Sequence, residues 1–367
     1  MQIKNKFKHL KKLLYPLSAI YYLFIFFRNL LFDYNIVKQN KLLCPVISIG
    51  NISTGGSGKT PMVIYLVNLL KKNNLKVGIL TRGYGRLVET PIIICNENKK
   101  IKQNLNFLKI GDEPLLLFEK LNGVPIGIDK NRFRTGKILL KNYNLDVIVL
   151  DDGFQHRSLY RDFEVVLINS LHKKRNHKLL PVGFLRESFS SLKRTDCIIV
   201  TKNNLSQPQD KLIEKIKNFQ PNIYYSRSIN NISKIFIPKI NALELLKNKK
   251  AYLLSGIGDP LSFQLSIKSL SKNIVGHCNL KDHFNYSQKD LNEIEIEAKK
   301  KNADFILTTE KDWVKLKSLN SKMPVLPVNL ELSIDDKANG LSFKELINDK
   351  IKFETYHRQK RHPQKLT

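Results

Sequence analysis

The sequence has few cysteines and few acidic side chains for its length. Among 367 residues there are four cysteines, and Cys44, Cys95, Cys197 and Cys278 form no Cys-x-x-Cys pair. This spacing argues against a disulfide framework and a zinc site, and it suits a reducing cytosol. The 32 acidic residues are outnumbered by 62 lysines and arginines, which gives a net charge of +30. Such a charge favours polyanionic partners, although lysines scattered along a chain can also reflect compositional bias alone.

The N-terminal region lacks an uncharged run of the length that a spanning helix needs. Residues 13–27 carry no charge, but Arg28 ends this run before it reaches the roughly 20 residues of a transmembrane helix. No small-residue cleavage site follows, which argues against a signal peptide. We expect residues 1–35 to form a helix in the membrane interface, with basic flanks on anionic headgroups. A true span and a buried core helix are the alternatives.

A glycine-rich segment between a strand and a helix is the most specific local feature. The β-branched run at 46–49 predicts a strand, and apolar periodicity up to Leu70 predicts a helix. In between, glycines let backbone N–H groups turn toward a triphosphate, the lysine reaches the outer phosphates and the following hydroxyl can ligate Mg²⁺. The strict P-loop spacing has glycine where Ser53 stands, so a plain Gly/Ser loop is the alternative. The predicted nucleotide-phosphate contacts are Thr54, Gly55, Gly56, Ser57, Gly58, Lys59 and Thr60.

A second acidic segment fits the same kind of site. The apolar residues 147–150 end in Asp151-Asp152, and a strand-end carboxylate of P-loop proteins holds Mg²⁺ directly or through water. A sharp polar turn follows at 153–157. The predicted Mg²⁺ ligands are Thr60, Asp151, Asp152, Glu113 and Gln155.

Strand and helix patterns alternate along the chain, which predicts an α/β fold: a P-loop NTPase-like, mostly parallel sheet with helices on both faces, and a smaller C-terminal α/β domain. We expect strands near 77–81, 92–95, 124–128, 163–168, 197–201, 251–255 and 305–309, and a polar turn at 310–313. The predicted domains are an N-terminal membrane-interface helix at 1–35, an ATP-binding domain at 36–215, a linker at 216–250 with a possible two-stranded ribbon, a smaller domain at 251–345 and a basic tail at 346–367 that is frayed from 356.

Three other classes of nucleotide-binding protein lack support. A P-loop GTPase normally reads guanine with Asn-Lys-x-Asp, and the sequence after the strand at 197–201 offers only Lys202-Asn203-Asn204. The Gly256/Gly258 pair lacks the third glycine of a dinucleotide site. The positive charge would suit a nucleic-acid-stimulated ATPase, but the apolar N-terminal run is not expected in such a protein. We therefore expect ATP as the nucleotide and no nucleic-acid partner.

Eight short motifs, in this order, resemble the tetraacyldisaccharide 4′-kinase family, which phosphorylates a lipid A precursor. They lie at 50–61, 81–86, 111–114, 151–156, 180–187, 256–260, 282–284 and 309–312. The resemblance implies a monomeric enzyme that transfers the γ-phosphate of ATP, with Mg²⁺, to the 4′-hydroxyl of a tetraacyldisaccharide 1-phosphate. It also implies a location at the cytoplasmic face of the bacterial inner membrane.

The same resemblance implies residue roles. Asp112 would be the base that takes the proton from the sugar hydroxyl, and His283 would orient it from the other domain, so that catalysis would require closure of a cleft. Lys59, Arg132 and Arg186 would neutralise charge on the transferring phosphate. Read alone, Asp112 could be a simple helix cap and His283 a surface imidazole.

Overall fold

The computed structural model describes residues 14–96, 107–172, 176–206, 210–220, 224–235, 246–335 and 342–361. The chain divides into two compact units: unit 1 contains residues 1–59, 152–227 and 336–367, and unit 2 contains residues 60–151 and 228–335. The boundary predicted near 215 therefore differs from this division, because residues 60–151 group with the C-terminal segment.

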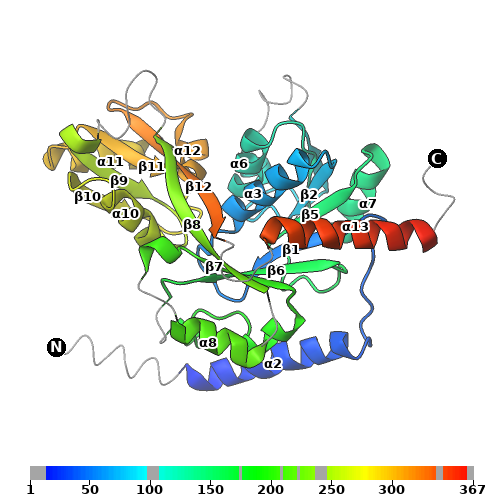
Figure 1. The fold of residues 1–367 in the computed structure, drawn as a ribbon. Coiled ribbons are helices and arrows are strands. Elements are labelled where there is room, and N and C mark those ends of the chain that lie inside the picture. Colours follow the sequence, from blue (N-terminus) through cyan, green and yellow to red (C-terminus); the bar gives the residue numbers. More distant parts are fainter. Residues whose placement is uncertain are drawn as a thin grey trace. The chain divides into compact units, whose positions relative to one another are not determined.

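Unit 1 is built on parallel strands (Figure 1). These are β1 (Val46–Asn51), β6 (Phe163–Asn169), β7 (Cys197–Thr201) and the start of β8 (Tyr224–Ile235). Each pairs in parallel with the next, in the order β1-β6-β7-β8. All residues of β1, β6 and β7 are buried, as expected for β-branched strands inside a parallel sheet.

A close backbone approach fixes the residue at the carboxyl end of β1. A Cβ atom on Gly50 would lie 2.5 Å from Cβ of Phe154, and the N–H of Gly153 donates to the carbonyl of Ile49 over 3.1 Å. Phe154 is fully buried in a core that includes side chains of β6, β7 and the 179–194 segment. Glycine at position 50 thus lets the turn after Asp152 pack onto the strand that leads into the glycine-rich loop.

The remaining elements of unit 1 are helical. They are α2 (Tyr15–Asp33), the 3₁₀ helices η2 (Phe189–Arg194) and η3 (Asn203–Leu205), α8 (Asp210–Phe219) and α13 (Phe343–Arg361). Within the described part of the chain, α2 is the one helix long and apolar enough to cross a membrane, judged by length and composition. Its exposed stripe includes Leu17, Ile20, Phe24 and Phe27.

Unit 2 contains two groups of strands. In the first, β5 (Val147–Asp151), β2 (Val77–Thr81) and β4 (Ile126–Ile128) are parallel neighbours, and β3 (Ile92–Ile94) joins β4 antiparallel. The helices of this part are α3 (Lys59–Lys72), which starts at the end of unit 1, α5 (Phe107–Ile110), α6 (Asp112–Lys120) and α7 (Arg132–Asn142).

The second group is wholly parallel, in the order β10-β9-β11-β12. Its strands are β9 (Ala251–Ser255), β10 (Ile274–Asn279), β11 (Phe305–Thr309) and β12 (Val325–Asp335), and its helices are α10 (Pro260–Lys268), α11 (Gln288–Lys300) and α12 (Glu310–Leu316). Alternate residues of β9 and β11 enter two separate cores, one with α10 and one with α11 and α12. Helices therefore cover both faces here, and the prediction of a mostly parallel α/β fold is confirmed.

Three local predictions differ from the structure. Residues 310–313 are not a turn but the start of α12, capped by the Thr309 side chain, which accepts from the N–H of Asp312. Within the described part of the linker, one long strand, β8, lies next to β12, instead of two short ones; residues 221–223 and 236–245 lie outside the described chain. The expected frayed tail is helical up to Arg361.

The C-terminal helix is held by apolar side chains, which generates a prediction. Phe343, Ile347 and Ile351 of α13 are buried. Ile347→Ala should lower the free energy of unfolding by about 2–5 kcal/mol, because it removes buried methyl groups and leaves a cavity. Urea denaturation measures this, and Lys344→Ala, at an exposed position of the same helix, is the matched control. Equal stability of the two variants would show that α13 does not dock through this face.

Candidate active site

The glycine-rich loop is held open by positive φ angles and by side chains from β6 and β7. Gly55 and Gly58 have φ of 91° and 87°, which favour glycine. The carbonyl of Gly56 accepts from Asn169 Nδ2 (3.2 Å), and that of Ser57 accepts from Thr201 Oγ1 (3.0 Å). In a trans peptide the next N–H points the opposite way, so the N–H groups of Ser57 and Gly58 face away from these partners. This is the geometry of an anion cradle.

Two residues at the start of the loop have structural partners. The N–H of Thr54 donates to the carbonyl of Phe184 over 2.7 Å, and its hydroxyl donates to the same oxygen over 3.2 Å. Ser53, which stands where the strict pattern has glycine, is buried and bridges to Leu185. In this structure the open part of the cradle therefore begins at Gly55.

Asp152 joins the loop lysine to an arginine. Its carboxylate lies 3.4 Å from Lys59 Nζ and 3.1 Å from Arg186 Nη1. Burial would raise the pKa of Asp152, but the charges of Lys59 and Arg186 outweigh it and lower the pKa to about 2. Arg186 also donates to Gln155 Oε1 over 3.4 Å. The structure thus brings together four of the predicted site residues within unit 1.

Oxygen donors that suit Mg²⁺ are present near the ends of β1 and β5. Asp151 accepts from the Thr81 hydroxyl over 3.0 Å, which orients its carboxylate, and Thr60 lies in the first turn of α3. Carboxylate and hydroxyl oxygens fit Mg²⁺, which usually takes one or two carboxylates together with substrate phosphates. In the described residues no three His, Cys, Asp or Glu side chains gather as a self-sufficient metal site.

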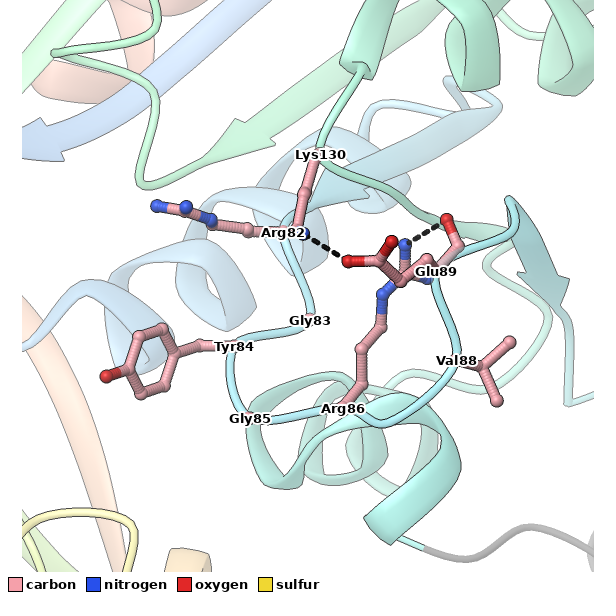
Figure 2. Close-up of a pocket in the computed structure, with 8 residues that line it drawn as sticks. All are labelled: Arg82, Gly83, Tyr84, Gly85, Arg86, Val88, Glu89 and Lys130. Atoms are coloured by element: carbon pink, nitrogen blue, oxygen red, sulfur yellow. Dashed lines mark hydrogen bonds and ion pairs between the residues drawn. The ribbon is translucent and has the colours of Figure 1, made fainter.

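The guanidinium of Arg86, in the loop after β2, is held by protein groups. Arg86 donates to the carbonyl of Ile128 over 2.8 Å and pairs with buried Asp129, so its guanidinium is structural. Figure 2 shows Arg86 and Lys130 directed at Glu89, with Arg82 pointing away from them. The loop encloses a small cavity of about 190 Å³.

Asp112 and His283 are in direct contact, as predicted. His283 Nδ1 lies 2.9 and 3.0 Å from the two carboxylate oxygens of Asp112. Asp112 occupies the first turn of α6 and is 5% exposed, while His283 adopts a left-handed conformation with φ of 61°. The Tyr84 ring lies 4.8 Å from the imidazole. Both members of the pair belong to unit 2, so the expectation that they come from separate domains and meet only on closure differs from the structure.

The neighbours of His283 fix its tautomer. Lys311 Nζ lies 3.2 Å from His283 Nε2, and an ammonium group can only donate, so Nε2 accepts and Nδ1 carries the hydrogen. Nδ1 therefore donates to Asp112. Lys311 also pairs with Glu113 at 3.0 Å and with Asp282 at 3.2 Å. Glu113, predicted as a metal ligand, is thus engaged with a lysine here.

Asp112 is kept ionised by positive neighbours. Lys315, 1% exposed, lies 3.3 Å from Asp112 Oδ2 and 3.7 Å from Asp312. Burial alone would raise the pKa of Asp112, but the hydrogen bond from His283 and the charges of Lys311 and Lys315 hold the pKa well below its ordinary value. The carboxylate is therefore ionised at neutral pH.

Arg132 is placed differently from the other predicted arginine. It is buried at the start of α7 in unit 2 and donates to the carbonyl of Lys130 over 3.1 Å. Arg186 lies in unit 1. The structure therefore gives Arg132 a local structural partner, and its phosphate-binding role stays a prediction.

Comparison with known proteins identifies the family. The family model described as tetraacyldisaccharide-1-P 4′-kinase (LpxK) matches residues 10–352. The chain belongs to this family. It is 33% identical over 318 residues to the tetraacyldisaccharide 4′-kinase of Halothermothrix orenii, covering 82% of this chain and 81% of that protein. It is 32% identical to that of Syntrophus aciditrophicus, over 93% of each chain.

A solved structure agrees in fold with this family member. A crystal structure of LpxK from Aquifex aeolicus in complex with ATP superposes with a TM-score of 0.71 at 29% identity, covering 93% of this chain and 99% of that one. Family membership makes the chain a kinase with ATP and Mg²⁺ as cofactors, which confirms the predicted enzyme class.

Sequence reasoning gave no role to several residues that the site contains. Lys311 lies within the motif at 309–312, but its contact with His283 depends on α12, which was expected to be a turn. Lys315 follows four residues later and so shares its helix face. The sequence feature that indicates a helix here is the Thr309-x-x-Asp312 spacing, which is a helix-capping pattern.

Asp112→Asn should make the free energy of unfolding less dependent on pH in the acid range. The pKa of Asp112 is lower in the folded than in the unfolded chain, so the ionised group stabilises the fold above the unfolded pKa of about 4, and this stabilisation is lost as the pH falls through the folded pKa. The stability difference between wild type and variant should shrink from about pH 6 to about pH 3 in urea denaturation.

Asp349→Asn, which removes an exposed carboxylate on α13, is the control for this measurement. A stability difference that stays constant over the pH range would contradict an ion-paired Asp112.

Proposed function

We propose that this chain transfers the γ-phosphate of ATP to the 4′-hydroxyl of a tetraacyldisaccharide 1-phosphate, with Asp112 as the general base. Family membership supports the reaction. The observation that carries the assignment of the base is the 2.9 Å contact of Asp112 with His283, whose tautomer Lys311 fixes. A carboxylate that only caps a helix has no need of an oriented imidazole.

The phosphate side of the reaction depends on positioning and charge. Phosphoryl transfer passes through a loose transition state, so most of the effect comes from holding the reactants in line and neutralising the phosphate oxygens. The loop N–H groups and Lys59 would bind the β- and γ-phosphates, and Arg186 would stabilise the transferring group. Mg²⁺, held by Thr60, Asp151 and Asp152 when bound, would neutralise the developing charge between the phosphates.

The proton side depends on Asp112. Its low pKa makes it a weak base, which suffices when the hydroxyl loses its proton late, as the new O–P bond forms and the hydroxyl becomes more acidic. His283 donates from Nδ1 and so holds the carboxylate in place without competing for the proton. Lys311 keeps the imidazole in that tautomer.

We also propose that the enzyme works at the cytoplasmic face of the inner membrane, with α2 in the interface. Four apolar side chains of α2, at positions 17, 20, 24 and 27, are between 53% and 66% exposed and recur at helical spacing along one face. The net charge of +30 would add attraction to anionic lipids. Because ATP is available on the cytoplasmic side, that face suits the reaction.

Asp112→Ala should lower kcat for ATP-dependent phosphorylation of the disaccharide lipid by about 10²- to 10⁴-fold, the usual contribution of a general base. His283→Ala should lower kcat too, and the double variant should be little worse than the poorer single one, because the two residues act as a unit. ATP affinity should survive in all three, measured by calorimetry. Additive losses, or loss of ATP affinity in Asp112→Ala, would show that Asp112 acts on the nucleotide instead.

Lys59→Ala is the contrasting variant for this experiment. It should fold normally, because Lys59 contacts a carboxylate and not the core, but it should lose both transfer and most of its ATP affinity. Near-normal turnover in folded Lys59→Ala would remove the assignment of the phosphate cradle.

Replacing Ile20, Phe24 and Phe27 together by serine should lower binding to vesicles that contain an anionic phospholipid by more than about tenfold. Each buried apolar side chain of this size contributes about 1.5–3 kcal/mol, and about 1.4 kcal/mol is tenfold in binding. Vesicle sedimentation measures the effect. Ile296→Ser, at a similarly exposed position of α11, is the control. Unchanged sedimentation of the triple variant would argue against membrane contact through α2.

A further inference from the structure

Glu187 is a fully buried carboxylate between helix α2 and the phosphate site. Its side chain is 0% exposed and accepts from Asn29 Nδ2 over 2.9 Å, from Arg194 Nη2 over 2.8 Å and from Gln155 Nε2 over 3.1 Å. Arg28 lies 3.4 Å away. An ionised carboxylate out of water is stable only with such a set of donors. Two of the four come from α2.

A continuous chain of hydrogen bonds and ion pairs leads from Glu187 to the loop lysine. Gln155 donates to Glu187 through Nε2 and accepts from Arg186 through Oε1, at 3.1 and 3.4 Å. Arg186 contacts Asp152 at 3.1 Å, and Asp152 contacts Lys59 at 3.4 Å. Gln155 Nε2 also donates to the carbonyl of Asn51 over 2.9 Å, so the amide is oriented by Glu187 and the β1 backbone on its nitrogen side and by Arg186 on its oxygen side.

Helix α2 also holds the backbone of the same segment. The Tyr21 hydroxyl donates to the carbonyl of Arg186 over 2.9 Å, and Ser18 donates to that of Leu179 over 3.2 Å. At the other end, Arg157 donates to the carbonyl of Asn29 and pairs with Asp33 at 2.7 Å. The side of α2 opposite its exposed apolar stripe is therefore bonded to the segment that carries Arg186.

We propose that Glu187 is a positioning residue for Gln155 and Arg186. Helix α2 completes the set of hydrogen-bond donors around Glu187. The position of α2 therefore determines the geometry of the phosphate site. The proposal rests on the proposed role of Arg186 at the transferring phosphate. Without the α2 donors, Glu187 keeps a buried charge with incomplete pairing, and its remaining partners shift toward it. Gln155 then releases Arg186, and the transition-state contact is weakened. Helix α2 thus supports the phosphate site as well as the contact with the membrane.

The test uses substrate dispersed in detergent, where vesicle binding is not needed. Asn29→Ala should lower kcat by about tenfold or more with little change in KM for the lipid, because an interaction made in the transition state is lost. Binding to anionic vesicles should stay as in wild type, because the apolar stripe is intact. Arg28→Gln, which removes a different donor, should show the same pattern. Asn68→Ala, at an exposed position of α3, is the matched control and should keep full turnover.

A double-variant comparison separates positioning from general destabilisation. In an Arg186→Ala background, Asn29→Ala should change kcat by less than about twofold, because its effect passes through Arg186. The coupling between α2 and Arg186 would be overturned if the two substitutions lowered kcat by independent factors that multiply. It would also be overturned if folded Asn29→Ala kept full turnover. Neither outcome would affect the proposed function. Full turnover of Arg186→Ala would instead overturn the role of Arg186 in the proposed function.

Discussion

An ionised carboxylate removed from water must be paired and hydrogen-bonded, and this constraint connects the segments of the chain that carry the site. Asp112 has partners 171 and 203 positions away, in His283 and Lys315. Glu187 has partners 158 and 159 positions away, in Asn29 and Arg28. In each unit, therefore, one buried acid holds segments together that are distant in the sequence.

Features governed by local chemistry could be predicted from the sequence. The strands at 77–81, 197–201, 251–255 and 305–309 agree residue for residue with the structure, because short apolar runs ended by polar or glycine residues allow few alternatives. The glycine-rich loop likewise depends on the chemistry of consecutive residues. Asp112 and His283 were paired only through the family resemblance, since nothing local connects residues so far apart.

The partners of the site residues could not be predicted, because they depend on tertiary contacts. Lys311 and Lys315 act together only because α12 is a helix, and seven residues give too weak a periodic signal against a polar turn. Arg86 lies in the motif at 81–86, but its position beside Asp129 makes it structural. The division of the chain into units was missed for the same reason, since unit 2 joins segments on either side of 152–227.

Arg28 shows how one residue can be misread from sequence alone. It ends the uncharged run of α2. From the sequence, its charge indicates only a limit on membrane insertion. In the structure its guanidinium lies 3.4 Å from the buried carboxylate of Glu187. A spanning helix must be surrounded by lipid for about 20 residues, whereas α2 makes hydrogen bonds to protein from Ser18 to Asn29. A helix bonded side-on to the protein over this length can offer lipid only its outer face. These hydrogen bonds therefore favour the proposed position of α2 in the interface over a helix that crosses the bilayer.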